Sequence, residues 1–269
     1  DGSRVSKGWF KVVPAEMLNK EKYDDDEESW YYADGSGNLY AGEFKTIKGK
    51  KYAFRNDGRM LTGLKFIKEG DEDFADVKAD DDDNRPFDNE DDFFDNAIEF
   101  YEPNGYKCYY FGGGDDGAMR TGKTTINYDG ENTSFYFEKS GGKKGAGVTG
   151  EKDDKLYQSG MLLKADTDDK YIVVEKQTHF KADGSKDYVT YTKLDGAKEF
   201  LDATGVIKTD VLGSNEGNTP INTGNNTTKK AEDLSEAYTI AYNGTVSGVQ
   251  YDYILVNTSG KVINTKSKN

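Results

Sequence analysis

The apolar positions of this chain recur as short aromatic runs, each followed by a glycine-containing turn. Clear runs occupy residues 30–32, 52–54, 109–111 and 135–137, and weaker copies lie at 156–163 and 253–262. The first two copies are offset by 21 residues, which separates Tyr31 from Tyr52 and Gly42 from Gly63. Glycine supplies the positive φ that tight turns between strands need. Each copy therefore predicts a β-hairpin.

Repetition of the hairpin predicts the fold class. A lone hairpin is marginally stable in water, so neighbouring hairpins are expected to stack and bury their aromatic faces. We predict an all-β fold of stacked β-hairpin repeats forming a β-solenoid-like array, with an acidic insertion and irregular loops. Helical periodicity is nearly absent, and residues 14–18 and 198–201 are each expected to form about one turn of helix.

The repeats and the segments between them predict five regions. These are N-terminal aromatic hairpin repeats at 1–68, an acidic insertion at 69–104, further hairpin repeats that degenerate toward their end at 105–212, a Gly/Asn/Thr-rich linker or loop at 213–232, and a C-terminal hairpin piece at 233–269. The linker is assigned because it contains almost no apolar residue.

Negative charge is concentrated in the acidic insertion. The 269 residues include 50 acidic and 36 basic side chains, a net charge of −14, whereas residues outside 69–104 hold 34 of each. The repeats are thus neutral, and the insertion is expected to be a solvated, mobile loop that orders only with a cation or a basic partner. An acidic chain without basic clusters argues against a nucleic-acid partner.

Cysteine content and apolar run length exclude two further classes. Cys108 is the only cysteine, so no intrachain disulfide forms, and it is expected to be a small buried hydrophobe. No apolar run approaches the ~18 residues of a membrane span. The sequence begins without an initiator methionine or signal peptide, so we expect the upstream region to be absent from this chain.

The aromatic strand, the glycine turn and the Thr-Gly that follows resemble the cell-wall-binding repeats of Gram-positive surface proteins. That superfamily includes choline-binding modules, glucan-binding repeats and the repetitive domains of clostridial toxins. The most similar stretches are residues 8–9, 30–32, 49–63 and 109–122. The resemblance implies a secreted or cell-wall-attached extracellular protein that has no catalysis of its own and binds a cell-wall polymer or glycan.

Aromatic side chains of the repeats are the candidate ligand-binding residues, because sugar rings stack on exposed aromatic faces. The candidates are Trp9, Trp30, Tyr31, Tyr32, Tyr52, Tyr109 and Tyr110, with Met60 as an additional wall. Side chains alternate along a strand, so about half of these are expected to face inward. Burial of Trp9 and Trp30 between hairpins is the interpretation we favour over a ligand role.

Choline binding is the less favoured alternative for these residues. In choline-binding members, Trp, Tyr and Met cage a quaternary ammonium by cation–π attraction. Here only Trp9 with Trp30 or Tyr31, with Met60 as an optional further member, could build such a cage. However, Leu64 and Lys123 follow the Thr-Gly pairs, where those members have Trp.

Other motifs are interpreted as structural. Residues 117–124 fit G-x-x-x-x-G-K-[ST] and residues 145–150 fit G-x-G-x-x-G, but a strand is expected to follow each instead of the helix that phosphate binding needs. His179 is the single histidine, so a catalytic triad or a multi-histidine metal site is excluded and we expect no enzyme.

Calcium is the one cofactor considered. Asp80, Asp82, Asp91 and Asp95 are weak candidate ligands, without an EF-hand loop, and a solvated acidic loop is the favoured interpretation. The remaining alternative function is a structural or adhesive stalk, or a repeat that binds a host or surface protein without glycan affinity.

Overall fold

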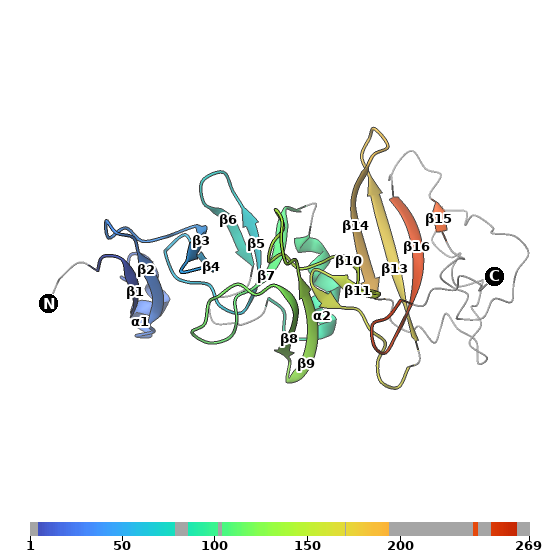
Figure 1. Ribbon diagram of the computed structural model, residues 1–269, viewed down its shortest axis with the longest axis horizontal. Helices are drawn as coiled ribbons and strands as arrows, with labels where there is room; N and C mark the ends of the chain where they lie inside the picture. Colours follow the sequence, from blue (N-terminus) through green and yellow to red (C-terminus); the bar gives the residue numbers. More distant parts are fainter. Residues whose placement is uncertain are drawn as a thin grey trace, which may run out of the picture. The chain divides into compact units, whose positions relative to one another are not determined.

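The computed structural model describes residues 5–78, 86–101, 104–169, 171–193, 239–241 and 249–262. These residues form small antiparallel sheets with a few short helices, which confirms the predicted all-β class (Figure 1). The chain divides into two compact units. Unit 1 comprises Asp1–Glu131 and Phe137–Gly147, and unit 2 comprises Asn132–Tyr136 and Val148–Asn269.

Unit 1 contains consecutive hairpins. Its elements are β1 (Gly8–Val12), α1 (Lys20–Asp24), β2 (Ser29–Ala33), β3 (Glu43–Ile47), β4 (Lys50–Phe54), β5 (Leu64–Glu69), β6 (Phe74–Lys78), α2 (Glu90–Asn96), the 3₁₀ helix η1 (Ala97–Phe100), β7 (Tyr106–Tyr110) and β8 (Gly122–Tyr128). Strand β1 pairs with β2, β3 pairs with β4, and β5 lies between β6 and β7, all antiparallel.

Unit 2 contains a longer sheet. Its elements are β10 (Gly150–Lys152), β11 (Lys155–Gln158), β12 (Met161–Leu162), β13 (Tyr171–Phe180), β14 (Lys186–Lys193), β15 (Thr239–Ala241) and β16 (Val249–Asn257), while β9 (Glu131–Phe137) is divided between the units. The order of the longer sheet is β14-β13-β16-β15.

Two kinds of turn join the strands. The two-residue turns have positive φ at both positions, as at Lys48 (49°) and Gly49 (81°), and this backbone matches the twist of the flanking strands. A five-residue turn recurs at 34–38, 55–59, 181–185 and 257–261, with its fourth residue a glycine at positive φ. In the second of these, Arg55 N–H donates to Arg59 C=O at 2.8 Å and Gly58 N–H to Arg55 C=O at 2.8 Å.

Successive hairpins of unit 1 are joined by equivalent backbone hydrogen bonds. The N–H of Met60 donates to Trp30 C=O at 2.8 Å, and the N–H of Met119 donates to Lys51 C=O at 2.8 Å. The N–H of Gly147 donates to Cys108 C=O at 2.7 Å. Trp30, Lys51 and Cys108 therefore occupy corresponding positions in three hairpins, which allows their side chains to be compared directly.

The acidic insertion is not a mobile loop where the structure describes it. Residues 71–78 and 86–101 contribute β6, α2 and η1, and Phe74, Phe93 and Phe94 are buried. The Phe93 ring lies 5.8 Å from Phe66 and 6.0 Å from Tyr128. The sequence-based expectation was wrong because the phenylalanines bury large apolar areas while the carboxylates stay at the surface. Residues 79–85 lie outside the described residues.

The short helix near the N-terminus begins later than predicted. Residues 16–18 form a turn, and the helix α1 starts at Lys20 because the Asn19 side chain caps it by accepting from Lys22 N–H at 3.0 Å. The helix expected at 198–201 and the linker at 213–232 lie outside the described residues.

Candidate ligand-binding site

Strand register assigns the aromatic residues of the first hairpin to two faces. Trp9 pairs with Tyr32 and Lys11 with Trp30, so these four side chains share one face. Phe10 pairs with Tyr31 on the opposite face.

On the first face, Trp9 is the centre of a group of rings. Its ring centroid lies 5.1 Å from Tyr32, 4.8 Å from Tyr52, 6.4 Å from Trp30 and 5.9 Å from Phe54. Tyr40 stacks on Tyr32 with centroids 5.4 Å apart. We call these residues the Trp9 cluster: Trp9, Trp30, Tyr32, Tyr40, Tyr52 and Phe54. Phe54 is buried and the other five are partly exposed, so the cluster offers aromatic surface to solvent.

Charged side chains border the Trp9 cluster and cover part of it. Lys11 Nζ lies 5.8 Å from the Trp30 centroid and 3.3 Å from an Asp115 oxygen. Lys45 Nζ lies 5.0 Å from the Tyr40 centroid and 2.8 Å from Glu43, whose hydrogen bond raises the pKa of Lys45. Each ammonium is paired with a carboxylate, so this rim has no net charge. It provides hydrogen-bonding groups beside the rings.

Tyr31 faces away from this surface. It is 2% exposed and stacks on Phe10 with centroids 5.6 Å apart. Burial, with a smaller contribution from Asp57 that Arg59 opposes, raises the pKa of Tyr31 to about 12. Its hydroxyl is buried without a hydrogen-bond partner among the described residues.

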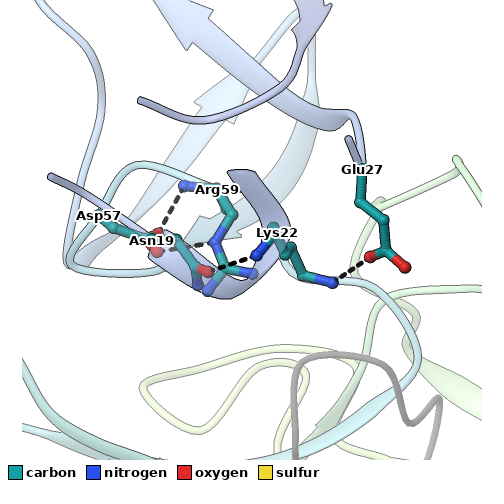
Figure 2. A network of polar contacts seen from close by, with 5 residues as sticks. All are labelled: Asn19, Lys22, Glu27, Asp57 and Arg59. Atoms are coloured by element: carbon teal, nitrogen blue, oxygen red, sulfur yellow. Dashed lines mark hydrogen bonds and ion pairs between the residues drawn. The ribbon is translucent and has the colours of Figure 1, made fainter. Parts of the chain in front are cut away.

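A polar network near Tyr31 holds the long β1–β2 connection in place. Lys22 of α1 is buried and its Nζ lies 2.6 Å from Glu27 Oε2, while Arg59 Nε donates to Asp57 Oδ2 at 2.7 Å. Figure 2 shows Asn19 and Lys22 beside Asp57 and Arg59 of the second hairpin's turn. Buried cations are tolerated because carboxylates pair with them. The connection thus lies beside the second hairpin's turn, on the Tyr31 side of the first hairpin.

A second cluster occupies the corresponding face of the second hairpin. Phe44 pairs with Ala53 and Thr46 with Lys51, so Phe44 and Lys51 share a face. The Phe44 centroid lies 5.1 Å from Phe74, 5.1 Å from Tyr109 and 6.4 Å from Phe111. We call Phe44, Phe74, Tyr109 and Phe111 the Phe44 cluster. Lys51 Nζ lies 4.4 Å from the Phe44 centroid, and burial lowers the pKa of Lys51.

The third hairpin has no comparable surface. Leu64 and Cys108 stand at the positions of Trp9 and Trp30, and Cys108 is buried as expected, with its thiol pKa raised by burial. Tyr110 stacks on Phe137 with centroids 6.3 Å apart.

The structure therefore distributes the sequence candidates unequally. It brings Trp9, Trp30, Tyr32 and Tyr52 together, and it separates Tyr31, Tyr109 and Tyr110 from them. Met60 contacts the Trp9 cluster only through its backbone N–H, which donates to the Trp30 carbonyl. Its side chain packs against Gly117, and a Cβ added to Gly117 would lie 2.2 Å from Met60 Sδ.

Two members of the cluster, Tyr40 and Phe54, were missed from sequence. Phe54 had a signal, because it follows Tyr52 by two positions in a strand and shares its face. Tyr40 lies outside the named strands, so no strand alternation pointed to it.

Neither glycine motif has the structure of a phosphate site. Residues 117–124 run directly into β8, and residues 145–150 are followed by the hairpin β10–β11. Their interpretation as repeat turns is confirmed, since no helix N-terminus is present to meet a phosphate. His179 stacks on Tyr188 with centroids 4.1 Å apart, and burial lowers its pKa.

The calcium candidates are only partly described. Asp91 and Asp95 lie on α2, while Asp80 and Asp82 fall outside the described residues. Within the described ranges, no group of three or more His, Cys, Asp or Glu is arranged to hold a metal. Within the same ranges, no helix is long and apolar enough to cross a bilayer.

Comparison with known proteins finds similarity among solved structures. No protein-family model and no curated protein matches the chain. The pneumococcal cell wall endolysin from phage Cp-1, complexed with choline, is 20% identical over 62% of this chain and 33% of its own, with a TM-score of 0.24. CbpF in complex with ipratropium is 19% identical over 59% of this chain and 49% of its own, with a TM-score of 0.18.

The choline-binding domain of CbpL from Streptococcus pneumoniae is 15% identical, covering 59% of this chain and 66% of its own, with a TM-score of 0.17. The chain thus spans a third of the endolysin and half of CbpF. At these identities and TM-scores, the likeness establishes neither the arrangement of the hairpins nor the ligand.

Proposed function

We propose that this chain is a non-catalytic binding module of a secreted or surface-attached Gram-positive bacterial protein, which it holds on a cell-wall polymer or extracellular glycan. The carrying observation is the partly exposed Trp9 cluster, in which the ring centroids of Tyr32 and Tyr52 lie 5.1 and 4.8 Å from that of Trp9. Aromatic faces bordered by a few hydrogen-bonding groups are the surfaces on which sugar rings stack.

The hairpins of unit 1 are proposed to form a β-solenoid-like array that presents this surface. The equivalent hydrogen bonds between successive hairpins support this arrangement. So does a second repeating contact, in which a turn glycine packs against an apolar side chain of the preceding turn. The pairs are Gly58 on Leu39, Gly117 on Met60 and Gly145 on Met119.

The charges near the Trp9 cluster favour an uncharged polymer as the ligand. Lys11 and Lys45 lie over the Trp30 and Tyr40 rings, where an external cation would have to bind. Because the two ammonium groups already occupy these ring faces, this arrangement disfavours choline. The acidic insertion in the same unit disfavours polyanions such as nucleic acids.

The alternative is a structural or adhesive stalk, or a module that binds a host protein without glycan affinity. One observation favours it: Trp9 packs against four other rings, as a core residue does. In that case the rings serve mainly to hold successive hairpins together.

Retention on purified peptidoglycan, teichoic acid and a panel of neutral glycans separates these functions. We expect retention on a wall polymer or neutral glycan, reduced about tenfold or more in Tyr32→Ala and Tyr40→Ala because each loses a stacking face. Tyr23→Ala is the matched control, since Tyr23 is a 49% exposed tyrosine on α1 outside the cluster. Lack of retention on every matrix would instead support the stalk, and elution by free choline would support a choline site.

A further inference from the structure

Three lysines of unit 1 border the Phe44 cluster, and each is carried by a different element. Lys51 of β4 has its Nζ 4.4 Å from the Phe44 ring centroid. Lys107 of β7 precedes Tyr109 by two positions, so the two side chains leave the strand on the same face. Both lysines are partly exposed. They are thus attached to one core and reach solvent beside it.

The third lysine belongs to the loop that follows β9. Lys144 is exposed, and it precedes by two residues Ala146, which is buried against the Phe44 cluster. The N–H of Gly147 donates to Cys108 C=O at 2.7 Å. This bond fixes the loop against β7, the strand that carries Lys107 beside Cys108.

The charges of the three lysines act on one another. Burial lowers the pKa of Lys51, Glu69 of β5 opposes this effect, and Lys144 and Lys107 add to it. Like charges disfavour each other's charged form when they are near. The three ammonium groups therefore lie in one neighbourhood, although they are far apart in the sequence. We call Lys51, Lys107 and Lys144 the lysine group.

Carboxylates do not neutralise the lysine group. Lys107 Nζ lies 4.0 Å from a Glu69 oxygen, and among the residues that the structure describes no other carboxylate lies within 4.0 Å of the three lysines. Three lysines against one glutamate leave a net charge of +2. By contrast, both lysines at the rim of the Trp9 cluster are paired with carboxylates.

Two of the ammonium groups are held in position before any ligand arrives. The Phe44 ring attracts the Lys51 ammonium through its quadrupole. The Glu69 carboxylate attracts that of Lys107. Side chains that are already ordered lose less conformational freedom when they bind.

We propose that the lysine group is a binding site for a phosphate dianion, either free or as a monoester. Lysine ammonium groups bind phosphate as point charges. A phosphate monoester carries a charge of about −1.5 to −2 at pH 7, which matches the net charge of the site. The inference goes beyond the proposed polymer binding and stands without it, because no member of the lysine group belongs to the Trp9 cluster.

Titration with inorganic phosphate at pH 7 and constant ionic strength, kept with sodium chloride, tests the proposal. Side-chain NMR signals of the lysines are the readout. We expect the signals of Lys51, Lys107 and Lys144 to shift together and to saturate. A parallel titration uses methyl phosphate. Tighter binding of methyl phosphate would assign the site to an ester-linked phosphate, and tighter binding of inorganic phosphate would assign it to the free ion.

Single charge changes sharpen this test. Lys107→Gln and Lys144→Gln each remove a positive charge, so phosphate binding should weaken about threefold or more. Glu69→Gln removes the opposing negative charge and should tighten binding by a similar factor. Lys50→Gln is the matched control, because Lys50 is an exposed lysine on β4 whose side chain leaves the strand opposite to that of Lys51. It should bind phosphate like the native chain.

Shifts that do not saturate, or that are equally large at Lys50, would show general attraction of counter-ions and overturn the proposal. Unchanged affinity in Glu69→Gln would also overturn it. Glu69 and Lys144 are exposed, so their variants are expected to fold. Polymer retention is measured separately. Loss of retention with intact phosphate binding would reject the proposed function alone, and the reverse result would reject the phosphate site alone.

Discussion

The Trp9 and Phe44 clusters share a backbone frame and differ in how they use it. Both are built from two side chains on one face of a hairpin, with a tyrosine of the next hairpin against the first ring. Where the first hairpin has Trp30 and Tyr32, the second has Lys51 and Ala53. The first cluster keeps partly exposed rings, whereas Tyr109 and Phe111 of the second are buried.

This difference shows that repetition of a hairpin does not imply repetition of an exposed aromatic surface. The hydrogen bonds that join successive hairpins use only backbone N–H and C=O groups, so they form at Trp30, Lys51 and Cys108 alike although the side chains there differ. Side chains at those positions then decide whether a surface is open, filled by a lysine, or converted to core.

The largest effect is expected at the contact between Gly117 and Met60, whose backbone N–H donates to Trp30 of the Trp9 cluster. Gly117 has a φ of 64°, and a Cβ there would lie 2.2 Å from Met60 Sδ. Gly117→Ala should lower the free energy of unfolding by about 2 to 3 kcal/mol, through the left-handed backbone and the displacement of Met60. Chemical denaturation measures this loss.

Gly130→Ala is the control for backbone conformation. Gly130 has a φ of 81° but no atom within 4 Å of the added Cβ. We expect it to cost only about 1 kcal/mol. Equal losses in the two variants would show that the Met60 contact contributes nothing.

Truncation of the two corresponding rings separates binding from stability. Trp9→Leu and Phe44→Leu should each destabilise the fold by about 2 kcal/mol, because each removes a ring packed against other aromatics. Trp9→Leu alone should also reduce retention on the polymer, by about tenfold or more. If Phe44→Leu lost as much retention as Trp9→Leu, the prediction that only the Trp9 cluster binds the polymer would be wrong.

The raised pKa of Tyr31 predicts a smaller change in the stability of the fold, which depends on pH. Its folded pKa of about 12 lies above the ordinary tyrosine value of 10.0, so the neutral hydroxyl favours the folded state. This contribution is complete below pH 10 and is lost as the pH rises toward about 12. Denaturation curves across that range should show a declining stability.

Tyr31→Phe should remove this part of the alkaline decline. Near neutral pH it should leave stability unchanged or raise it by up to about 1 kcal/mol, because the hydroxyl has no hydrogen-bond partner among the described residues. An unchanged alkaline decline in Tyr31→Phe would assign the titration to another group.

The smallest effect is expected at the rim of the Trp9 cluster. Lys11→Gln removes the ion pair with Asp115, whose side chain is 65% exposed, and should change stability by less than about 0.5 kcal/mol. It also uncovers the Trp30 ring. Polymer retention should rise slightly, and a strong loss of retention would make Lys11 a binding group instead of a cover.

The sequence by itself determined the hairpins. Glycines at positive φ, short aromatic strands and an internal offset are local signals, and they located the strands at 29–33, 50–54 and 106–110 closely. Local signals also classified the two glycine motifs as turns, because the residues after each of them favour a strand. The burial of Cys108 within an aromatic strand followed from the same pattern.

Only the tertiary structure decided which aromatic residues meet and which are covered. Trp9 meets Tyr52, and Phe44 meets Tyr109, from successive hairpins, although the residues of each pair lie far apart in the sequence. The acidic segment forms α2 because its phenylalanines reach Phe66 and Tyr128 outside it. Likewise, the position of Lys51 over Phe44 depends on cross-strand register. The alternation of residues in the sequence indicates which side of a strand a side chain faces. Whether that side chain is buried depends on which other part of the chain packs against that side.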